Sequence, residues 1–170
     1  MGVVGRELQS LGLQPAQRRH EIAVMVTGDE IRGVLRGPSS LRLSDLMNER
    51  DTFLELSTCF VGKDHVELVW PVDAAVEGPG THDLRVNKQP RRARLRFAGF
   101  TVDADLHIAD GATLEAAVAN SQVRFLAATN ATILALNPRD GQATFHQPFI
   151  LLNRQRIVFL TRLDADRTEP

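Results

Sequence analysis

Apolar and polar residues alternate along most of this chain, and a period of two predicts β-strands rather than helices. The expected strands are 20–28, 30–37, 52–61 and 65–76 in the first half, and 93–99, 101–109, 123–136, 142–152 and 154–160 in the second. Helical spacing is confined to the short segments 2–13, 41–51 and 113–121. The pattern therefore predicts a mainly β fold with short helices.

The order of strand, strand, short helix, strand, strand occurs twice. Gly28 aligns with Gly99 at an offset of 71 residues, and one extra residue later Phe53 aligns with Phe125. A repeat of this length indicates a duplicated small domain rather than a solenoid unit. We expect two tandem ββαββ modules that form small antiparallel sheets or Sm/SH3-like barrels and pack around a pseudo-twofold axis.

Polar segments rich in Gly and Pro set the expected domain boundaries. The predicted organisation is an N-terminal helix and linker (1–19), a first module (20–80), a linker (81–93), a second module (94–162) and a polar tail (163–170). Ser40 or Ser44 is the expected cap of the first module's helix. Trp70 is the expected packing anchor before Pro71.

The apolar faces of the strands and helices predict the core. The residues expected to be buried are Leu35, Leu43, Leu46, Phe53, Leu56, Leu106, Leu114, Val118, Phe125 and Leu126. Because side chains alternate across a strand, a one-residue error in register would expose every one of these strand residues.

Composition excludes several classes of protein. The chain has 170 residues and a net charge of −1, so no overall attraction to nucleic acid or to an anionic membrane is expected. No apolar stretch is long enough to suggest a membrane span. Cys59 is the only cysteine, which excludes an intramolecular disulfide and is typical of a cytoplasmic protein.

Three motifs of the first module are 30–35 (EIRGVL), 42–48 (RLSDLMN) and 53–56 (FLEL), and 152–157 (LNRQRI) closes the second module. In these motifs the chain resembles an uncharacterised bacterial small-domain family, for which the resemblance implies no activity. A more distant likeness is to the Sm-like barrel, in which a short polar turn such as Asn153-Arg154 reads RNA. Sm proteins place their helix first, whereas this chain places one between its second and third strands.

Asp103, Asp105 and His107 alternate along one predicted strand and so share one face. Two carboxylates and an imidazole suit a divalent metal. The same alternation occurs on any strand with one face in water, and this simpler interpretation is preferred, so no metal and no cofactor are predicted.

Arginines form the only basic cluster in the sequence. Arg92, Arg94 and Arg96 share one face of a predicted strand, and Arg154 lies at the last turn. They could bind the phosphates of a nucleic acid. No aromatic residue interleaves them to stack on bases, so a charged outer face of an edge strand is the preferred interpretation.

Two further alternatives concern chemistry and assembly. Cys59 with a histidine could form a nucleophile pair, but its Ser-Thr-Cys-Phe surroundings resemble no nucleophile elbow, and a small core residue is favoured. At equivalent hairpin positions the first module carries Arg32 and Arg36, and the second carries Asp103 and His107. Such opposite charges favour a contact between modules or between chains.

We therefore expect a non-enzymatic, cytoplasmic bacterial protein that binds protein partners, itself included, as a scaffold or adaptor. The interface residues of this hypothesis are Arg32, Arg36, Asp103, Asp105 and His107. The alternative is an Sm-like nucleic-acid binder that uses Arg92, Arg94, Arg96 and Arg154. A small hydrolase or metalloprotein is the third candidate.

Overall fold

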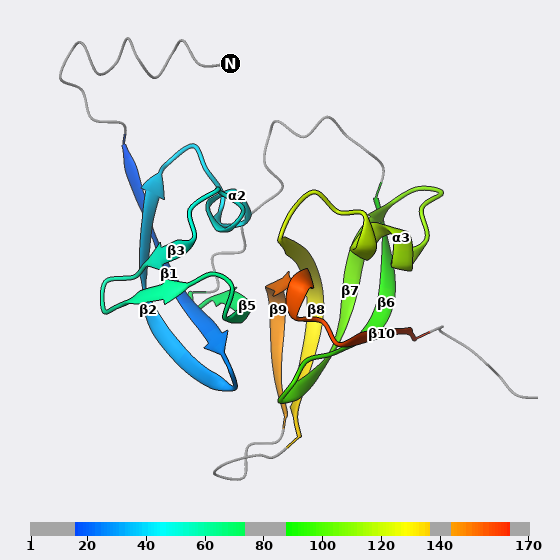
Figure 1. Cartoon of the computed structure of the whole chain (residues 1–170). Helices are drawn as coiled ribbons and strands as arrows, with labels where there is room; N and C mark the ends of the chain where they lie inside the picture. Colours follow the sequence, from blue (N-terminus) through cyan, green and yellow to red (C-terminus); the bar gives the residue numbers. More distant parts are fainter. Residues whose placement is uncertain (1–15, 74–87, 137–143, 164–170) are drawn as a thin grey trace, which may run out of the picture.

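The computed structural model describes residues 16–73, 88–136 and 144–163. Its main feature is one open, antiparallel, eight-stranded sheet with the strand order β10-β6-β7-β8-β9-β5-β1-β2, accompanied by a small two-stranded sheet, β3-β4 (Figure 1). The mainly β prediction is thus confirmed. The two halves share a single sheet instead of forming separate small sheets, and no barrel closure is found among the described strands.

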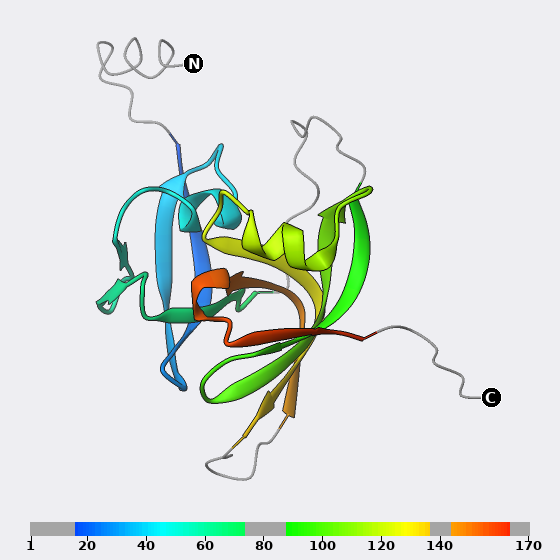
Figure 2. The ribbon, with the colours of Figure 1, turned by 45° about the vertical axis from the view of Figure 1, so that its right-hand side comes forward.

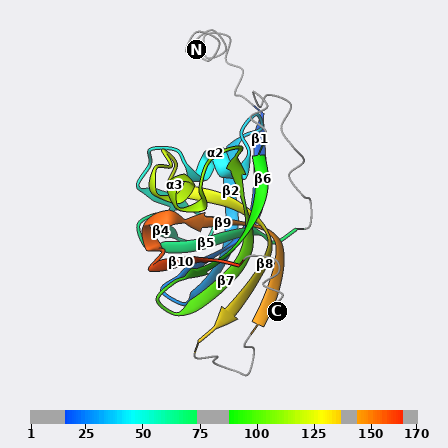
Figure 3. The ribbon, with the colours of Figure 1, turned by 90° about the vertical axis from the view of Figure 1, so that its right-hand side faces the viewer.

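Six elements form the first half: β1 (Gln17–Val26), β2 (Asp29–Pro38), α2 (Leu43–Met47), β3 (Phe53–Glu55), β4 (Phe60–Gly62) and β5 (Val66–Pro71). The second half contains β6 (Lys88–Arg96), β7 (Phe100–Ala109), α3 (Leu114–Ala119), β8 (Phe125–Ala135), β9 (Thr144–Asn153), a single 3₁₀ turn (Arg154–Arg156) and β10 (Phe159–Arg162). Both short helices lie at the same end of the strands (Figure 3).

The first hairpin has the turn that its sequence predicts. Thr27 and Gly28 both adopt positive φ angles, 49° and 87°, as a two-residue turn between twisted strands requires. Further along β2, Gly37 lets α2 approach closely, because a Cβ atom there would lie 2.5 Å from Leu46 Cδ2. The absence of a side chain at Gly37 therefore allows Leu46 of α2 to pack directly against the backbone of β2.

The two halves pair their strands in the same register. Met25 lies opposite Glu30 in the first hairpin, and 71 residues later Arg96 lies opposite Thr101. The bridge between Leu35 and Leu56 corresponds to the pair of Leu106 with Ala128, at offsets of 71 and 72.

The last strands of each half follow the same rule at a larger offset. The pairs Phe53–Gly62 and Val24–Val69 correspond to Phe125–Asn153 and Leu95–Leu160. Residues of β4 and β5 therefore have equivalents 91 positions later, in β9 and β10. In both halves the last strand lies beside the first, so that β5 neighbours β1 and β10 neighbours β6 (Figure 2).

The halves join where β5 pairs with β9, through Leu68 opposite Leu152 and Val69 opposite Leu151. This junction pairs the last strand of one half with the fourth strand of the other. A twofold axis would instead pair like strands, so the predicted pseudo-twofold arrangement is wrong for this junction.

Two apolar clusters cover the two faces of the central strands. Val24 and Val69 belong to the first cluster, which Phe125 and Leu151 of the second half enter. Leu68 and Trp70 belong to the second cluster, where Trp70 contacts Phe145 at 5.7 Å between ring centroids. Strand β5 is therefore buried on both faces, and Trp70 is the packing anchor that the sequence predicted.

The predicted core is correct at most positions and wrong at Phe53. Phe53 is 60% exposed, and its neighbour Leu54 is buried instead. The physical reason is that 52–61 forms not one strand but the β3–β4 hairpin, whose inward face carries Leu54 and Val61. Val118 and Leu126 are half-buried rather than buried.

Several boundaries also differ from prediction. β1 and β6 begin at Gln17 and Lys88, inside the segments expected to be linkers, because both pair with their neighbours from these residues onward. Neither serine caps α2; Arg42 holds the N-cap position, and its backbone N–H donates to the Asp45 carboxylate at 3.0 Å. The predicted N-terminal helix and almost all of the tail lie outside the described residues.

Candidate functional site

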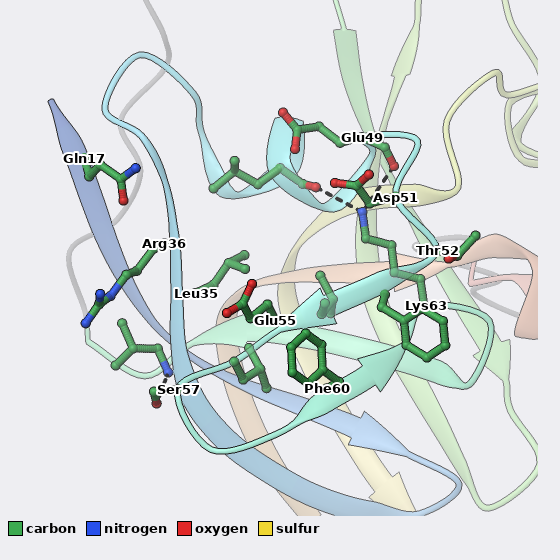
Figure 4. A pocket seen from close by; sticks show the side chains of 15 residues that line it. Gln17, Leu35, Arg36, Glu49, Asp51, Thr52, Glu55, Ser57, Phe60 and Lys63 are labelled. Carbon is green, nitrogen blue, oxygen red and sulfur yellow. Dashed lines mark hydrogen bonds between the residues drawn. The ribbon is translucent and has the colours of Figure 1, made fainter. Parts of the chain in front are cut away.

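An open groove lies on the first half, between β2, the segment after α2 and the β3–β4 hairpin (Figure 4). Its volume is about 870 Å³. Phe53 and Phe60 contribute apolar surface, whereas Arg36, Glu49 and Glu55 contribute charge. A groove that combines aromatic side chains with charged ones suits a protein segment better than it suits a small apolar molecule.

The two aromatic side chains of the groove share one face of the β3–β4 hairpin. Phe53 pairs with Gly62, and Glu55 pairs with Phe60, so Phe53 and Phe60 are diagonal neighbours on the same side. They are 60% and 71% exposed. Together they form an exposed aromatic patch on one face of the hairpin.

Lys63 forms the inner wall of the groove and is 2% exposed. Its ammonium group donates to the carbonyl oxygens of Leu46 at 3.2 Å and Glu49 at 3.1 Å (Figure 4). Burial lowers the pKa of Lys63, and the nearby Asp51 and Glu49 carboxylates oppose that shift. Because the amine is aimed at carbonyls that end α2, it acts as a structural clamp for the groove wall.

Arg154 is the second-half equivalent of Lys63, because its side chain also donates to a carbonyl oxygen of the short helix in its own half. Its guanidinium donates to the carbonyl oxygen of Ala119, the last residue of α3, at 3.5 Å and to that of Val123, shortly before β8, at 2.9 Å. Arg154 lies 91 residues after Lys63, the same offset that relates the last strands of the halves. Arg154 therefore has a structural role within the protein, and its presence in the Asn153-Arg154 turn does not require an RNA ligand.

A second exposed apolar surface lies on β10 and the residue before it. Val158 is 66% exposed and Phe159 is 53% exposed. Together with Phe53 and Phe60, they are the four most exposed large apolar residues of the described part of the chain. Val158 and Phe159 lie next to and in β10, which ends the large sheet, whereas Phe53 and Phe60 lie in the separate β3–β4 sheet.

The sequence-predicted acidic residues lie together on β7 but do not meet Arg32 or Arg36. Asp103 accepts two hydrogen bonds of 2.7 Å from Arg94, and these lower the pKa of Asp103. Arg92 contacts Asp105 at 3.3 Å. The two charged sets that the sequence suggested for different functions therefore neutralise each other on one sheet face.

The remaining predicted interface residues have separate surroundings. Arg32 forms an ion pair with Glu30 of its own strand. Arg36 lines the groove, and His107 Nε2 shares a hydrogen bond of 2.8 Å with Thr129 Oγ1. No contact between the halves forms through Arg32 or Arg36 and the acidic face of β7.

The arginine cluster is engaged within the protein. In addition to its contact with Asp105, Arg92 donates to the Asn130 carbonyl at 2.7 Å, and Arg96 donates to Thr101 Oγ1 at 3.3 Å. In the described ranges, no group of three or more His, Cys, Asp or Glu side chains is close enough to hold a metal ion. Cys59 is half-buried against the first apolar cluster.

Sequence reasoning missed the groove because it treated 52–61 as one strand. It also missed Lys63, although a signal was present. Extending the repeat at the offset of 91 residues aligns Lys63 with Arg154, two basic residues after a strand.

No family model, curated protein sequence or solved structure matches the chain. Among the residues that the structure describes, no helix is long and apolar enough to cross a membrane.

Proposed function

We propose that this protein is a non-enzymatic scaffold that binds protein partners and associates with itself. The observation that carries the proposal is the pair of exposed apolar surfaces, Phe53 with Phe60 on one side and Val158 with Phe159 on the other. Scattered single apolar residues are normal on a protein surface, but aromatic groups gathered around a groove mark an interaction site.

We also propose that the chain consists of two copies of one module. Matched strand registers at offsets of 71, 72 and 91 residues support this proposal, as does the matched helix contact of Lys63 and Arg154. In each copy a fifth strand returns to the side of the first. The two proposed copies already pair with each other through β5 and β9. This supports a scaffold, because the equivalent strands, β10 and β4, remain available for further contacts.

The nucleic-acid alternative gains no support from the arginine positions. Arg92 and Arg94 pair with Asp105 and Asp103, and carboxylates beside a phosphate site would repel a nucleic acid. Arg154 clamps α3. We therefore keep protein binding as the single proposed function.

Sedimentation velocity tests the proposal. We expect the wild-type chain to form species larger than a monomer as concentration rises, and the Phe53→Ser, Phe60→Ser double variant to remain a monomer at the same concentrations. Leu136→Ser is the matched control, because Leu136 is exposed (39%) but lies after β8, away from the groove. A wild-type chain that stays monomeric at all concentrations would contradict self-association.

A further inference from the structure

We infer that the partner of the groove is β10 of a second copy of this chain, which pairs with β4 in the register of the internal β5–β9 junction. The inference rests on the proposed function and names its partner. It predicts a contact between unlike surfaces, with Leu160 of one copy opposite Phe60 of the next and Phe159 opposite Val61.

The internal junction is the template. β5 pairs with β9 through Leu68–Leu152 and Val69–Leu151, and all four side chains are 0% exposed. Phe125, which begins β8, inserts into the apolar cluster of the first half and is 1% exposed. The second half therefore closes the core of the first.

A polar contact fixes the alignment of this junction. The Asn48 side chain donates to the Phe125 carbonyl at 3.0 Å and accepts from the Phe125 N–H at 2.8 Å. Asn48 is the residue that ends α2, and Asn120 ends α3 in the same way. Asn120 is exposed.

The equivalents of the joined residues differ in exposure: Phe159 and Phe60 are more than half exposed, Leu160 is half-buried, and Val61, the equivalent of Leu152, is 5% exposed. Leu68 and Val69 correspond to Phe159 and Leu160, 91 residues later; Leu151 corresponds to Phe60, 91 residues earlier. Phe125 corresponds to Phe53, 72 residues earlier. Phe53 and Phe60 thus have the positions of side chains that the internal junction buries, and no second junction covers them within the described residues.

The second half has a matching opening. In the first half Met47 and Val69, which pack in the cluster that Phe125 and Leu151 enter, are 0% exposed. Their equivalents, Val118 and Leu160, are only partly buried at the margin of the second cluster. Phe53 and Phe60 of a second copy would close this margin as Phe125 and Leu151 close the first.

The backbone is available at both ends. β10 is the terminal strand of the large sheet, and among described residues β4 pairs only with β3. Such terminal strands present unpaired N–H and C=O groups, which are a template for another strand.

The two junctions are not identical. Arg94 and Arg96 stand where the internal junction has Ala23 and Met25, and Gly62 stands where it has Asn153, which donates to the Val66 carbonyl. The contact between chains therefore buries less apolar surface and lacks the two hydrogen bonds that the Asn153 amide donates to the Lys63 and Val66 carbonyl oxygens. We expect it to dissociate on dilution, whereas the internal junction remains closed.

Because the contact joins two different surfaces, each chain has one free β4 surface and one free β10 surface. Repetition of such a contact generates rings when the rotation closes and filaments when it does not. The ring size depends on the rotation at each contact.

A complementation experiment with the full chain tests the inference. Phe60→Arg removes the β4 surface and Phe159→Arg removes the β10 surface; both residues are more than half exposed, so the fold should tolerate the changes. We expect each variant alone to be a monomer by sedimentation velocity at concentrations where the wild type assembles. An equimolar mixture should form a dimer that grows no further, because only one intact pair of surfaces remains.

The other outcomes are equally informative. Self-association of Phe159→Arg alone would indicate a β4–β4 contact, and self-association of Phe60→Arg alone would indicate a β10–β10 contact; either overturns the inference. If the wild type assembles, the groove variant does not, and the mixture stays monomeric, the proposed function stands and this inference fails. A monomeric wild type overturns both.

Disulfide formation tests the register. In a Cys59→Ser background, chains with Phe60→Cys mixed with chains with Leu160→Cys should form a mixed disulfide dimer, because the inferred register places these residues opposite each other. Chains with Phe60→Cys mixed with chains with Arg162→Cys, two residues along the same strand, are the matched control. Equal cross-linking in both mixtures would contradict the register.

Discussion

Lys63 and Arg154 illustrate how one residue secures a short helix in each half. The helices have five and six residues, too few to be stable without tertiary contacts. A basic side chain directly after the fourth strand of each half donates to a carbonyl oxygen in the last turn of the helix, that of Leu46 in α2 and that of Ala119 in α3. Lys63 thereby positions the end of α2, which lines the groove, next to β4.

Replacement of Lys63 tests this role. Lys63→Met leaves two carbonyl oxygens without their donor, and we expect it to lower the free energy of unfolding by about 1–3 kcal/mol. Lys63→Arg is the matched control, since the second half uses arginine at the equivalent position, and it should cost less. Urea denaturation measures both; an unchanged midpoint for Lys63→Met would show that the clamp contributes nothing.

Glu67 makes stability depend on pH. It is 1% exposed, and burial raises its pKa, while hydrogen bonding from the Gly28 N–H and the charge of Arg156 oppose the shift. A carboxyl group whose pKa is higher in the folded state than in the unfolded state contributes stability below the unfolded pKa. That contribution is lost as pH rises through the folded pKa.

Glu67→Gln removes this titration. We expect the stability of the variant relative to wild type to increase from pH 4 toward pH 8, because only the wild type must bury a charge at the higher pH. Arg156 shares the site, so the measurement should be repeated with Arg156→Gln, in which the increase should be larger. Thermal unfolding curves across this range provide the test, and a difference independent of pH would count against it.

At the scale of elements, Phe53 and Phe125 occupy equivalent positions in opposite environments. Phe125→Ala should lower the free energy of unfolding by about 3–5 kcal/mol, because it empties a packed site at the junction. Phe53→Ala should change it by less than about 0.5 kcal/mol, as expected for an exposed residue. Chemical denaturation at a concentration where the chain is monomeric compares the two, and similar losses would mean that β3 is buried in solution.

The same pair shows what the sequence could predict. The β1–β2 and β6–β7 hairpins followed from alternation and turn residues, because these are local properties. The proposed repeat also came from the sequence, since Gly28 and Gly99 lie at the same place between paired strands, although only Gly28 has a positive φ. The fate of Phe53 did not follow, because exposure at that position depends on whether another module packs there, which is a tertiary property.

The candidate site was less predictable than the fold. Arg94 and Asp103 were each recognised as notable, but the sequence did not reveal that they face each other across a β6–β7 pair. The register of that pair follows from the hairpin turn, so their neutralisation could have been derived with a longer argument. The β3–β4 groove could not, because the turn at Ser57-Thr58 lacks the glycine that usually marks a tight hairpin.

At the scale of the whole molecule, one chain contains one completed junction, β5–β9, and the inferred assembly adds a second between β10 of one copy and β4 of the next. Asn48 belongs to the completed junction, where its amide satisfies the buried backbone of Phe125. Asn120 ends the other helix and, in the inferred assembly, meets the backbone of Phe53 in a second copy. The same substitution at these two positions should therefore have different consequences.

Asn48→Ala should lower the free energy of unfolding of the isolated chain by about 1–3 kcal/mol, because it leaves buried backbone groups unpaired. Asn120→Ala should leave unfolding of the monomer unchanged and raise the concentration needed for half-assembly by roughly tenfold, which corresponds to about 1.4 kcal/mol. Urea denaturation of dilute protein and sedimentation across concentrations separate the two effects. If Asn120→Ala assembles as readily as wild type, the contact between chains does not reproduce the polar alignment of the internal junction, even where the strands themselves pair.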